Sequence, residues 1–300
     1  MKELIVLLRV FRKIYPLAEE IKMIRRSLIY FLLVVPALVY VVILSFIPAA
    51  TVVFDSFQTP TKHYVFSNYI AIYNAGLGNS IINTLFVSIG ALLLQLIIAI
   101  FIANIMSKPF RGNKAFSIAT IIPFGVSTIV AGFIFSIIFS AVGGFANSFL
   151  HLIGLHPVDW YQNNIYEMAV VIFSDYWKNT PLVALVIFSG LTSLSPVMFE
   201  SAKVDGAGPL SRFRHIMLPN LMPAITVALL IRGVSEFNIF ALPLVLIGYH
   251  PSLINTLVYE FYSSSSTLYY SYAAATVLLL IILGYAGVLI WKGGIGKNAA

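Results

Sequence analysis

Long apolar runs separated by short polar connections are the strongest pattern in this sequence. About 20 predominantly apolar residues are needed for a helix to cross the roughly 30 Å hydrocarbon core of a bilayer. Six runs meet that length, and four of them contain no charged residue. They predict membrane-spanning helices at residues 28–49, 80–106, 115–141, 166–194, 221–247 and 272–291. The pattern therefore predicts an all-α, polytopic membrane protein.

Composition supports a membrane protein and argues against a soluble enzyme. Hydrophobic residues make up 60% of the 300 residues and charged residues only 10%, and the mean hydropathy is +0.95. A soluble domain is typically about 45–50% apolar and about 25% charged. The chain has no cysteine, which excludes a disulfide, a thiolate zinc site and a cysteine nucleophile.

The basic residues are unevenly distributed between the connections. The chain has 18 Lys and Arg against 11 Asp and Glu, a formal net charge of +7. Seven of the 18 precede the first span, three follow the second, three follow the fourth and two follow the sixth, 15 in all. Because short cytoplasmic loops are rich in Lys and Arg, this pattern predicts that both termini are cytoplasmic. It also explains the basic charge without a nucleic-acid partner.

The segments outside the spans predict a simple domain organisation. Residues 1–27 mix basic side chains with Leu, Ile, Val and Phe, which predicts an amphipathic helix on the anionic inner leaflet; the alternative is a frayed basic tail. We expect one transmembrane domain at 28–291, in contact with membrane lipid, and a cytoplasmic tail at 292–300.

The connection between the fourth and fifth spans, residues 195–219, has the signals of a folded loop. Ser195-Pro196 is a typical N-cap and first helical residue, because the serine hydroxyl can accept an orphan amide hydrogen bond and proline has no amide to satisfy. A helix is expected over 197–204 and a second over 210–217. The glycines and proline of 205–209 separate them. The sequence predicts a helix, a tight bend and a second helix across the membrane face.

The residue spacing within this loop is specific. Glu200-Ser201-Ala202 is followed after three residues by Gly206, and after nine more by Ile216-Met217-Leu218-Pro219. These positions resemble the EAA loop of binding-protein-dependent ABC transporter permeases. Ser201 departs from the pattern, since the family usually has alanine there. Val204-Asp205-Gly206-Ala207 and Phe213 are similar to the carbohydrate branch, the maltose-type and glycerol-phosphate-type permeases.

The resemblance covers most of the chain, from about residue 28 to 291. Further positions similar to sugar permeases lie in the external segments and at the start of the second span: Ser56-Phe57, Phe66-Ser67-Asn68-Tyr69, Asn83-Thr84, Gly144, Asn147, Leu150, Gly154 and Trp160. The fifth-to-sixth connection departs from the pattern. Gly248-Tyr249-His250-Pro251 stands where those permeases often have Gly-Gly-Pro.

The resemblance implies a permease subunit of an ATP-driven, binding-protein-dependent sugar importer in the plasma (inner) membrane of a prokaryote. The expected cargo is a monosaccharide such as glucose, or a short oligosaccharide. The implied partners are a second permease subunit, two ATPase subunits that hold ATP and Mg²⁺, and an extracytoplasmic sugar-binding protein. No cofactor or metal and no catalytic residue is expected on this chain itself.

The sequence lacks an ATP-binding P-loop, which is consistent with ATP hydrolysis on a partner subunit. A P-loop requires G-x-x-x-x-G-K-[ST], and the nearest text, Gly296-Lys297-Asn298, lacks the hydroxyl and has Trp291 in place of the first glycine. In the family, the short helix of the loop sits in a cleft of the ATPase. By resemblance Glu200 is the polar anchor and Gly206 the bend. The implied coupling residues are Glu200, Ser201, Ala202, Asp205, Gly206, Ile216, Leu218 and Pro219.

Amides and aromatic rings in the fourth and fifth spans are candidates for the substrate path, because sugars are bound by amide hydrogen bonds and by stacking on aromatic faces. Phe237-Asn238-Ile239-Phe240 resembles the F-N-x-F stretch that lines the path in sugar permeases. The candidate residues are Asn238, Phe237, Phe240, Trp177, Tyr176 and Asn179. The alternative for the aromatic residues is lipid contact or packing.

Four charged residues in the interior of the predicted spans need an explanation, because a charge costs about 2.5–3.5 kcal/mol at the centre of a span. Arg232 and Glu236 are four residues apart, on one helical face, so we expect a mutual ion pair or a contact with the partner permease. Asp175 and Lys178 lie in the predicted outer half of the fourth span, where snorkelling to the interface is the expected solution.

A second class of function also fits six spans, namely a secondary transporter or channel that acts alone. It gives no reason for the spacing in the 195–219 loop and usually shows repeated halves. An intramembrane enzyme is disfavoured, because the five histidines lie in connections or near span ends and the sequence has neither H-x-x-x-H nor G-x-S-x-G.

Overall fold

The computed structural model describes residues 29–59, 61 and 63–293. The chain divides into two compact units, residues 1–55 and 56–300. The predicted amphipathic segment at 1–27 and the end of the predicted tail, 294–300, lie outside the described residues. Regular structure in the described part is helical, apart from one isolated bridge between Gln58 and Tyr64. The predicted all-α fold is confirmed.

The described part of the first unit is one apolar helix that is long enough to span a membrane, Ile29–Asp55. It contains a π-helical turn, η1 (Val42–Phe46), and ends with α2 (Ile47–Asp55). The predicted first span is confirmed, although the helix continues beyond residue 49.

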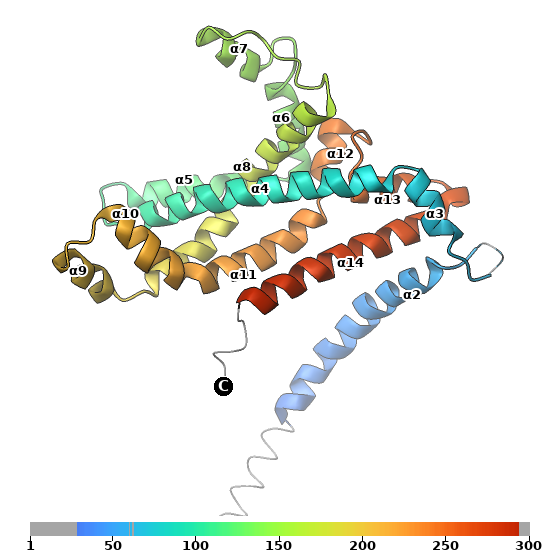
Figure 1. Cartoon of the computed structure of the whole chain (residues 1–300), viewed down its shortest axis with the longest axis horizontal. Coiled ribbons are helices and arrows are strands. Elements are labelled where there is room, and N and C mark those ends of the chain that lie inside the picture. The colour runs from blue at the N-terminus through green and yellow to red at the C-terminus, as the bar shows by residue number, and fades with distance from the viewer. Residues whose placement is uncertain (1–28, 60, 62, 294–300) are drawn as a thin grey trace, which may run out of the picture. The chain divides into compact units, whose positions relative to one another are not determined.

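Four long helices form the centre of the second unit (Figure 1): α4 (Leu77–Met106), α8 (Asn164–Thr192), α11 (Leu218–Phe237) and α14 (Leu268–Gly293). Helix α11 packs against the other three, and α4 packs along α8. Each lies in a helix of 26 or more residues with the length and hydropathy of a membrane span. With the first span and the bent pair described next, the described residues hold up to six spans, as predicted.

The third predicted span, 115–141, is not one straight helix. It consists of α5 (Asn113–Gly125) and α6 (Thr128–Ile138), which meet at an angle of 96°. Val126 and Ser127 between them are extended, with ψ of 133° and 140°. Pro123 and Gly125 weaken helical continuity at this point, because proline supplies no amide and glycine adds backbone freedom. The predicted third span therefore corresponds to a bent pair of helices.

The fifth span also differs from its predicted limits of 221–247. One continuous helical stretch, Pro209–Phe237, joins α10 (Pro209–Arg212), the π-helical turn η2 (Phe213–Met217) and α11. Phe240 leaves helical geometry at φ −138° and ψ −63°, and a separate helix, α12 (Ala241–Ile247), follows it. Helix α12 packs against α6 and α8. The predicted fifth span included both α11 and α12, because both helices are apolar and hydropathy alone does not reveal the break between them.

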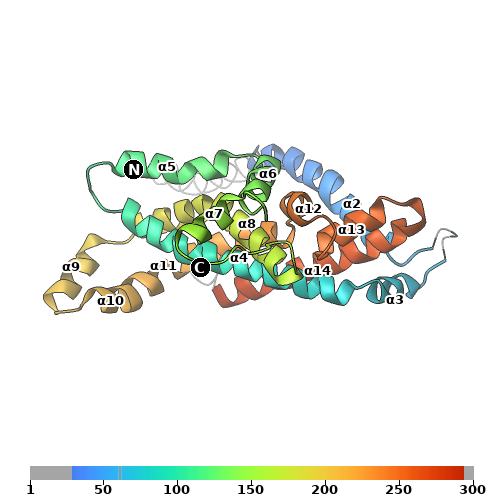
Figure 2. The same ribbon diagram turned by 90° about the horizontal axis from the view of Figure 1, so that it is seen from above.

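Short helices lie at the two ends of the second unit. Helix α9 (Pro196–Val204) and α10 lie at the same end as the α4–α5 connection (Figures 1 and 2). The opposite end carries α3 (Ser67–Asn74), α13 (Ile254–Tyr262) and η3 (Ser265–Thr267). Helix α7 (Phe145–Leu152) follows α6.

Hydrogen bonds from asparagines fix the connections that follow the first and third spans. Asn68 donates from Nδ2 to the carbonyls of Ser56 and Gln58, each at 2.8 Å. Asn147 donates to the carbonyls of Ala141 and Val158 and accepts from Val158 N and Trp160 Nε1, each at 3.0 Å. Both asparagines belong to the segments that resemble sugar permeases.

Two close contacts fix the spacing of the long helices. Gly190 on α8 lies where a Cβ would meet the Ala224 side chain of α11. Gly233 on α11 lies against the ring of Tyr285 on α14, whose hydroxyl donates to the Leu229 carbonyl at 2.9 Å. Any larger side chain at Gly233 displaces that ring.

Candidate functional site

The loop between the fourth and fifth spans has the predicted helix, bend and helix. Ser195 is the N-cap of α9 and Pro196 its first residue, as expected, but the serine side chain makes no capping hydrogen bond. Helix α9 ends through hydrogen bonds from Gly206 N to the Lys203 carbonyl and from Ala207 N to the Ala202 carbonyl, at 3.1 and 2.9 Å. Gly206 has φ +76°, a conformation that favours glycine.

The predicted coupling residues differ in exposure. Glu200, Ser201, Asp205, Gly206 and Pro219 are exposed at the surface of the loop and its junction with α11. Ile216 and Leu218 are half-buried, and Ala202 is buried within this chain. The side of α9 that remains open therefore presents Ser201 rather than Ala202.

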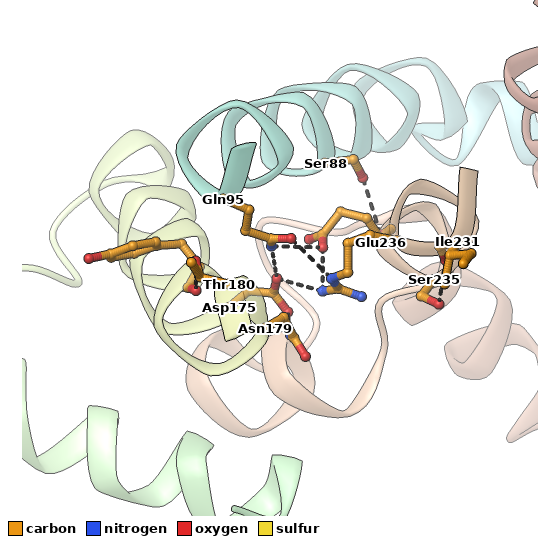
Figure 3. Close-up of polar contacts among 10 residues, drawn as sticks. Ser88, Gln95, Asp175, Asn179, Thr180, Ile231, Ser235 and Glu236 are labelled. Carbon is orange, nitrogen blue, oxygen red and sulfur yellow. Dashed lines mark hydrogen bonds and ion pairs between the residues drawn. The ribbon is translucent and has the colours of Figure 1, made fainter. Parts of the chain in front are cut away.

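A cluster of buried polar side chains joins α4, α8 and α11 (Figure 3). We call Gln95, Asp175, Arg232 and Glu236 the polar cluster. Arg232 Nη2 contacts Asp175 Oδ2 at 2.7 Å and Glu236 Oε2 at 2.5 Å. Gln95 donates to Asp175 Oδ2 at 2.7 Å and accepts from Arg232 Nε at 3.1 Å. Every member is at most 7% exposed.

The polar cluster confirms one prediction and overturns another. Arg232 and Glu236 form the expected pair one turn apart. Asp175 does not snorkel to an interface; it is 3% exposed and bound to Arg232 from another helix. The prediction of snorkelling is wrong because a partner on α11 satisfies the carboxylate at depth, which a single-helix pattern does not reveal.

Sequence reasoning missed Gln95 and Ser88. Ser88 Oγ donates to the Glu236 carbonyl at 3.2 Å, near the end of α11. The available signal for Gln95 was a lone amide within the run Leu92-Leu93-Leu94-Gln95-Leu96, because an amide in the hydrocarbon region must find partners.

Lys178 does not snorkel either. It lies 14 residues from each end of α8, and the residue is 8% exposed. Its ammonium lies over the ring of Phe124 on α5, 5.6 Å from the ring centre. The predicted position in the outer half was wrong because α8 begins at Asn164 and ends at Thr192, which makes Lys178 its midpoint.

The predicted path residues on the fifth span surround the end of α11. Asn238 is its exposed C-cap, and its carbonyl and Oδ1 each accept a hydrogen bond of 2.8 Å from Asn255 Nδ2. Phe237 is buried against Tyr285, with ring centres 4.8 Å apart. Phe240 lies against Tyr259 at 5.1 Å.

The predicted path residues on α8 form a separate group. Asn179 donates to Asp175 Oδ1 at 2.8 Å and so supports the polar cluster. Trp177 packs edge-on against Phe135, and Tyr176 against Phe173, each with ring centres 5.4 Å apart. No hydrogen bond or ring contact between described residues joins this group directly to Asn238.

Taken together, the long apolar helices define a multi-pass membrane protein with an exposed helix–bend–helix loop. The chain belongs to the family described as the binding-protein-dependent transport system inner membrane component, which matches residues 95–292. It is accordingly an inner-membrane permease subunit of an ABC transporter, and not an enzyme.

Named relatives agree with this family. The sulfoquinovosyl glycerol transport system permease protein SmoG of Agrobacterium fabrum is 30% identical over 237 residues, 75% of this chain and 76% of the relative. The trehalose/maltose transport system permease protein MalF of Thermococcus litoralis is 26% identical over 250 residues, 80% and 85% of the two chains. A chain in the crystal structure of a bacterial ABC transporter that imports alginate shares the fold, with a TM-score of 0.76, 22% identity and coverage of 92% and 99%.

Proposed function

We propose that this chain is the permease subunit of an ATP-driven, binding-protein-dependent sugar importer and forms half of its translocation path. The family match and the saccharide transport systems for which the relatives are named support this function. The observation that carries the proposal is the exposed loop of α9 and α10, which interrupts an otherwise membrane-embedded chain between α8 and α11. The expected cargo is a monosaccharide or a short oligosaccharide.

The surface of the loop supports docking to an ATPase subunit. Three apolar side chains on it are highly exposed, Val197 at 64%, Val204 at 88% and Leu210 at 78%. Burial of such side chains in a cleft of a partner gains about 25 cal/mol per Å² of apolar surface. Glu200 and Asp205, both exposed, add polar contacts at the rim.

The connections of the loop support a route for coupling. Helix α9 follows α8 after three residues, and α10 is continuous with α11 through η2. A displacement of α9 by the ATPase therefore reaches α8 and α11 directly. These two helices carry most of the polar cluster and the predicted path residues, so the loop's motion alters the path where sugar passes.

The expected complex contains a second permease subunit, two ATPase subunits with ATP and Mg²⁺, and an extracytoplasmic sugar-binding protein. The loop of α9 and α10 and the α4–α5 connection lie at one end of the second unit, and both are basic (Figure 1). This arrangement supports a cytoplasmic location for that end, and we assign both termini to the same side.

Asn238 is the best-placed candidate to contact the sugar. Its Oδ1 accepts from Asn255, which leaves its own Nδ2 donor without an acceptor among the described residues. Phe240 lies two residues further along the chain, and its ring begins a row with Tyr259 and Tyr249, with ring centres 5.1 and 6.5 Å apart. An open amide donor beside aromatic rings suits a sugar, which offers hydroxyl acceptors and C–H faces.

The test is uptake by the complete transporter in sealed vesicles, with the binding protein outside and ATP inside. The proposal predicts sugar accumulation that requires ATP, the ATPase subunits and the binding protein. The alternative, a stand-alone secondary transporter or channel, predicts accumulation by this chain alone on a proton or sodium gradient. That second result contradicts the proposal.

A further inference from the structure

Lys178 is a buried cation at the centre of a membrane-spanning helix. Fourteen residues separate it from each end of α8, which is about 21 Å at 1.5 Å per residue. A lysine side chain is far too short to bring its ammonium to either interface from there. An ammonium facing lipid at this depth is costly, so the charge must face protein or an aqueous path.

No acceptor within the described chain satisfies this ammonium. Among the described residues it makes no hydrogen bond and no ion pair within 4.0 Å, and it lies over the ring of Phe124. Asp175, one turn away on α8, is already bound by Arg232 and Gln95 through Oδ2 and by Asn179 through Oδ1. The nearest carboxylate on α8 is therefore committed to other donors.

The ammonium lies beside non-helical backbone in the third span. Phe124 is 42% exposed, and it lies next to Gly125, where α5 ends and the third span bends by 96°. Non-helical backbone at membrane depth is tolerated only where protein buries it or where it lines a water-filled cavity. Lys178 thus lies beside a break in a span, and two predicted path residues, Trp177 and Asn179, flank it in sequence.

We propose that Lys178 binds the anionic group of an acidic saccharide during its passage, so that this transporter selects sugars bearing a carboxylate, sulfonate or phosphate. The proposal rests on the sugar-import function above and names its substrate class. An opposite charge compensates a desolvated ammonium, whereas a neutral hydroxyl does so only weakly. A site for neutral sugars needs no fixed cation, since amides such as Asn238 supply donors without the cost of burying a charge.

The test uses the complete reconstituted transporter and size-matched saccharides that are neutral or carry one carboxylate, sulfonate or phosphate. We expect ATP-dependent uptake of at least one acidic saccharide and much slower uptake of its neutral counterpart; the acidic group that is accepted identifies the anion. Lys178→Gln lowers uptake of that saccharide by about tenfold or more, as expected for loss of a charged hydrogen bond. Lys178→Arg retains most of it. Lys114→Gln, which removes an exposed charge at the other end of α5, leaves uptake unchanged.

Three results overturn the inference. Uptake confined to neutral saccharides shows that the sugar-import function is correct and the charge selection is not. Loss of the partner permease from purified Lys178→Gln complexes, with charge preference unaltered in those that assemble, assigns the ammonium to an intersubunit ion pair. Uptake of no saccharide, acidic or neutral, overturns the proposed function and this inference with it.

Discussion

Arg232 on α11 contacts Asp175 on α8 at 2.7 Å, and both side chains are more than nine-tenths buried. The same guanidinium nitrogen contacts Glu236 one turn further along α11. Arg232 therefore links two helices that the loop of α9 and α10 also connects along the chain.

Breaking the link is expected to destabilise the bundle strongly. Asp175→Asn leaves Arg232 paired only with Glu236 on its own helix and weakens the link to α8; loss of one member of a buried ion pair costs up to about 3–5 kcal/mol. The thermal unfolding midpoint of the purified complex should fall clearly below that of the wild type. Glu260→Gln, an exposed carboxylate on α13, serves as the control and should leave the midpoint unchanged. Equal midpoints for the wild type and Asp175→Asn would show that the buried pair contributes little.

Packing between α11 and α14 depends on the absence of a side chain at Gly233. Gly233→Val places a branched side chain against the Tyr285 ring, and such overpacking costs about 1–3 kcal/mol. Tyr285→Phe removes only the hydrogen bond to Leu229, worth about 1 kcal/mol. Gly233→Ala should lower the thermal unfolding midpoint less in a Tyr285→Ala background than in the wild type, because the ring that the added Cβ meets is then absent. Strictly additive effects of the two alanine substitutions would contradict the proposed contact.

Asn147 should control the order of the connection between α6 and α8. Its side chain makes four hydrogen bonds of 3.0 Å, and Asn147→Leu removes all of them while leaving the backbone groups of Val158 unpaired. We expect limited proteolysis to cut this connection faster in the variant. Ser148→Ala, which loses a single bond to the Gly144 carbonyl, should be cut at the wild-type rate. Identical cleavage of both variants would refute the role of Asn147.

Asn238→Leu should abolish most sugar uptake while the permease still assembles with its partners. The substitution removes the exposed amide and also the acceptor of Asn255. Asn255→Leu is the informative second variant, because it frees Asn238 without removing its amide and should reduce uptake less. Assembly is checked by co-purification of the ATPase subunits. Wild-type uptake by correctly assembled Asn238→Leu complexes would exclude Asn238 from the path.

Hydropathy was sufficient to predict six spans because apolar length is set by bilayer thickness. It could not distinguish one helix from two bent ones, since α5 and α6 are both apolar; Pro123 with Gly125 was the available signal. Arg232 and Glu236 were predicted as a pair because they share one helix. Asp175 and Gln95 were not, because their contacts depend on how α4, α8 and α11 pack, which no local pattern records.

Energy from an ATPase is proposed to enter this chain through the loop bent at Gly206. Its φ of +76° is strained for any branched residue, so Gly206→Val changes the angle between α9 and α10 without touching a span. Gly208→Ala is the matched control, because Gly208 has φ −66° and open space where a Cβ would lie.

The decisive measurement is ATP-driven sugar uptake and substrate-stimulated ATPase activity in the reconstituted complex. We expect that Gly206→Val inserts into the membrane and assembles, yet loses uptake and stimulated ATP hydrolysis, while Gly208→Ala behaves as the wild type. Normal stimulated hydrolysis and uptake by Gly206→Val would contradict the assignment of this loop as the coupling surface.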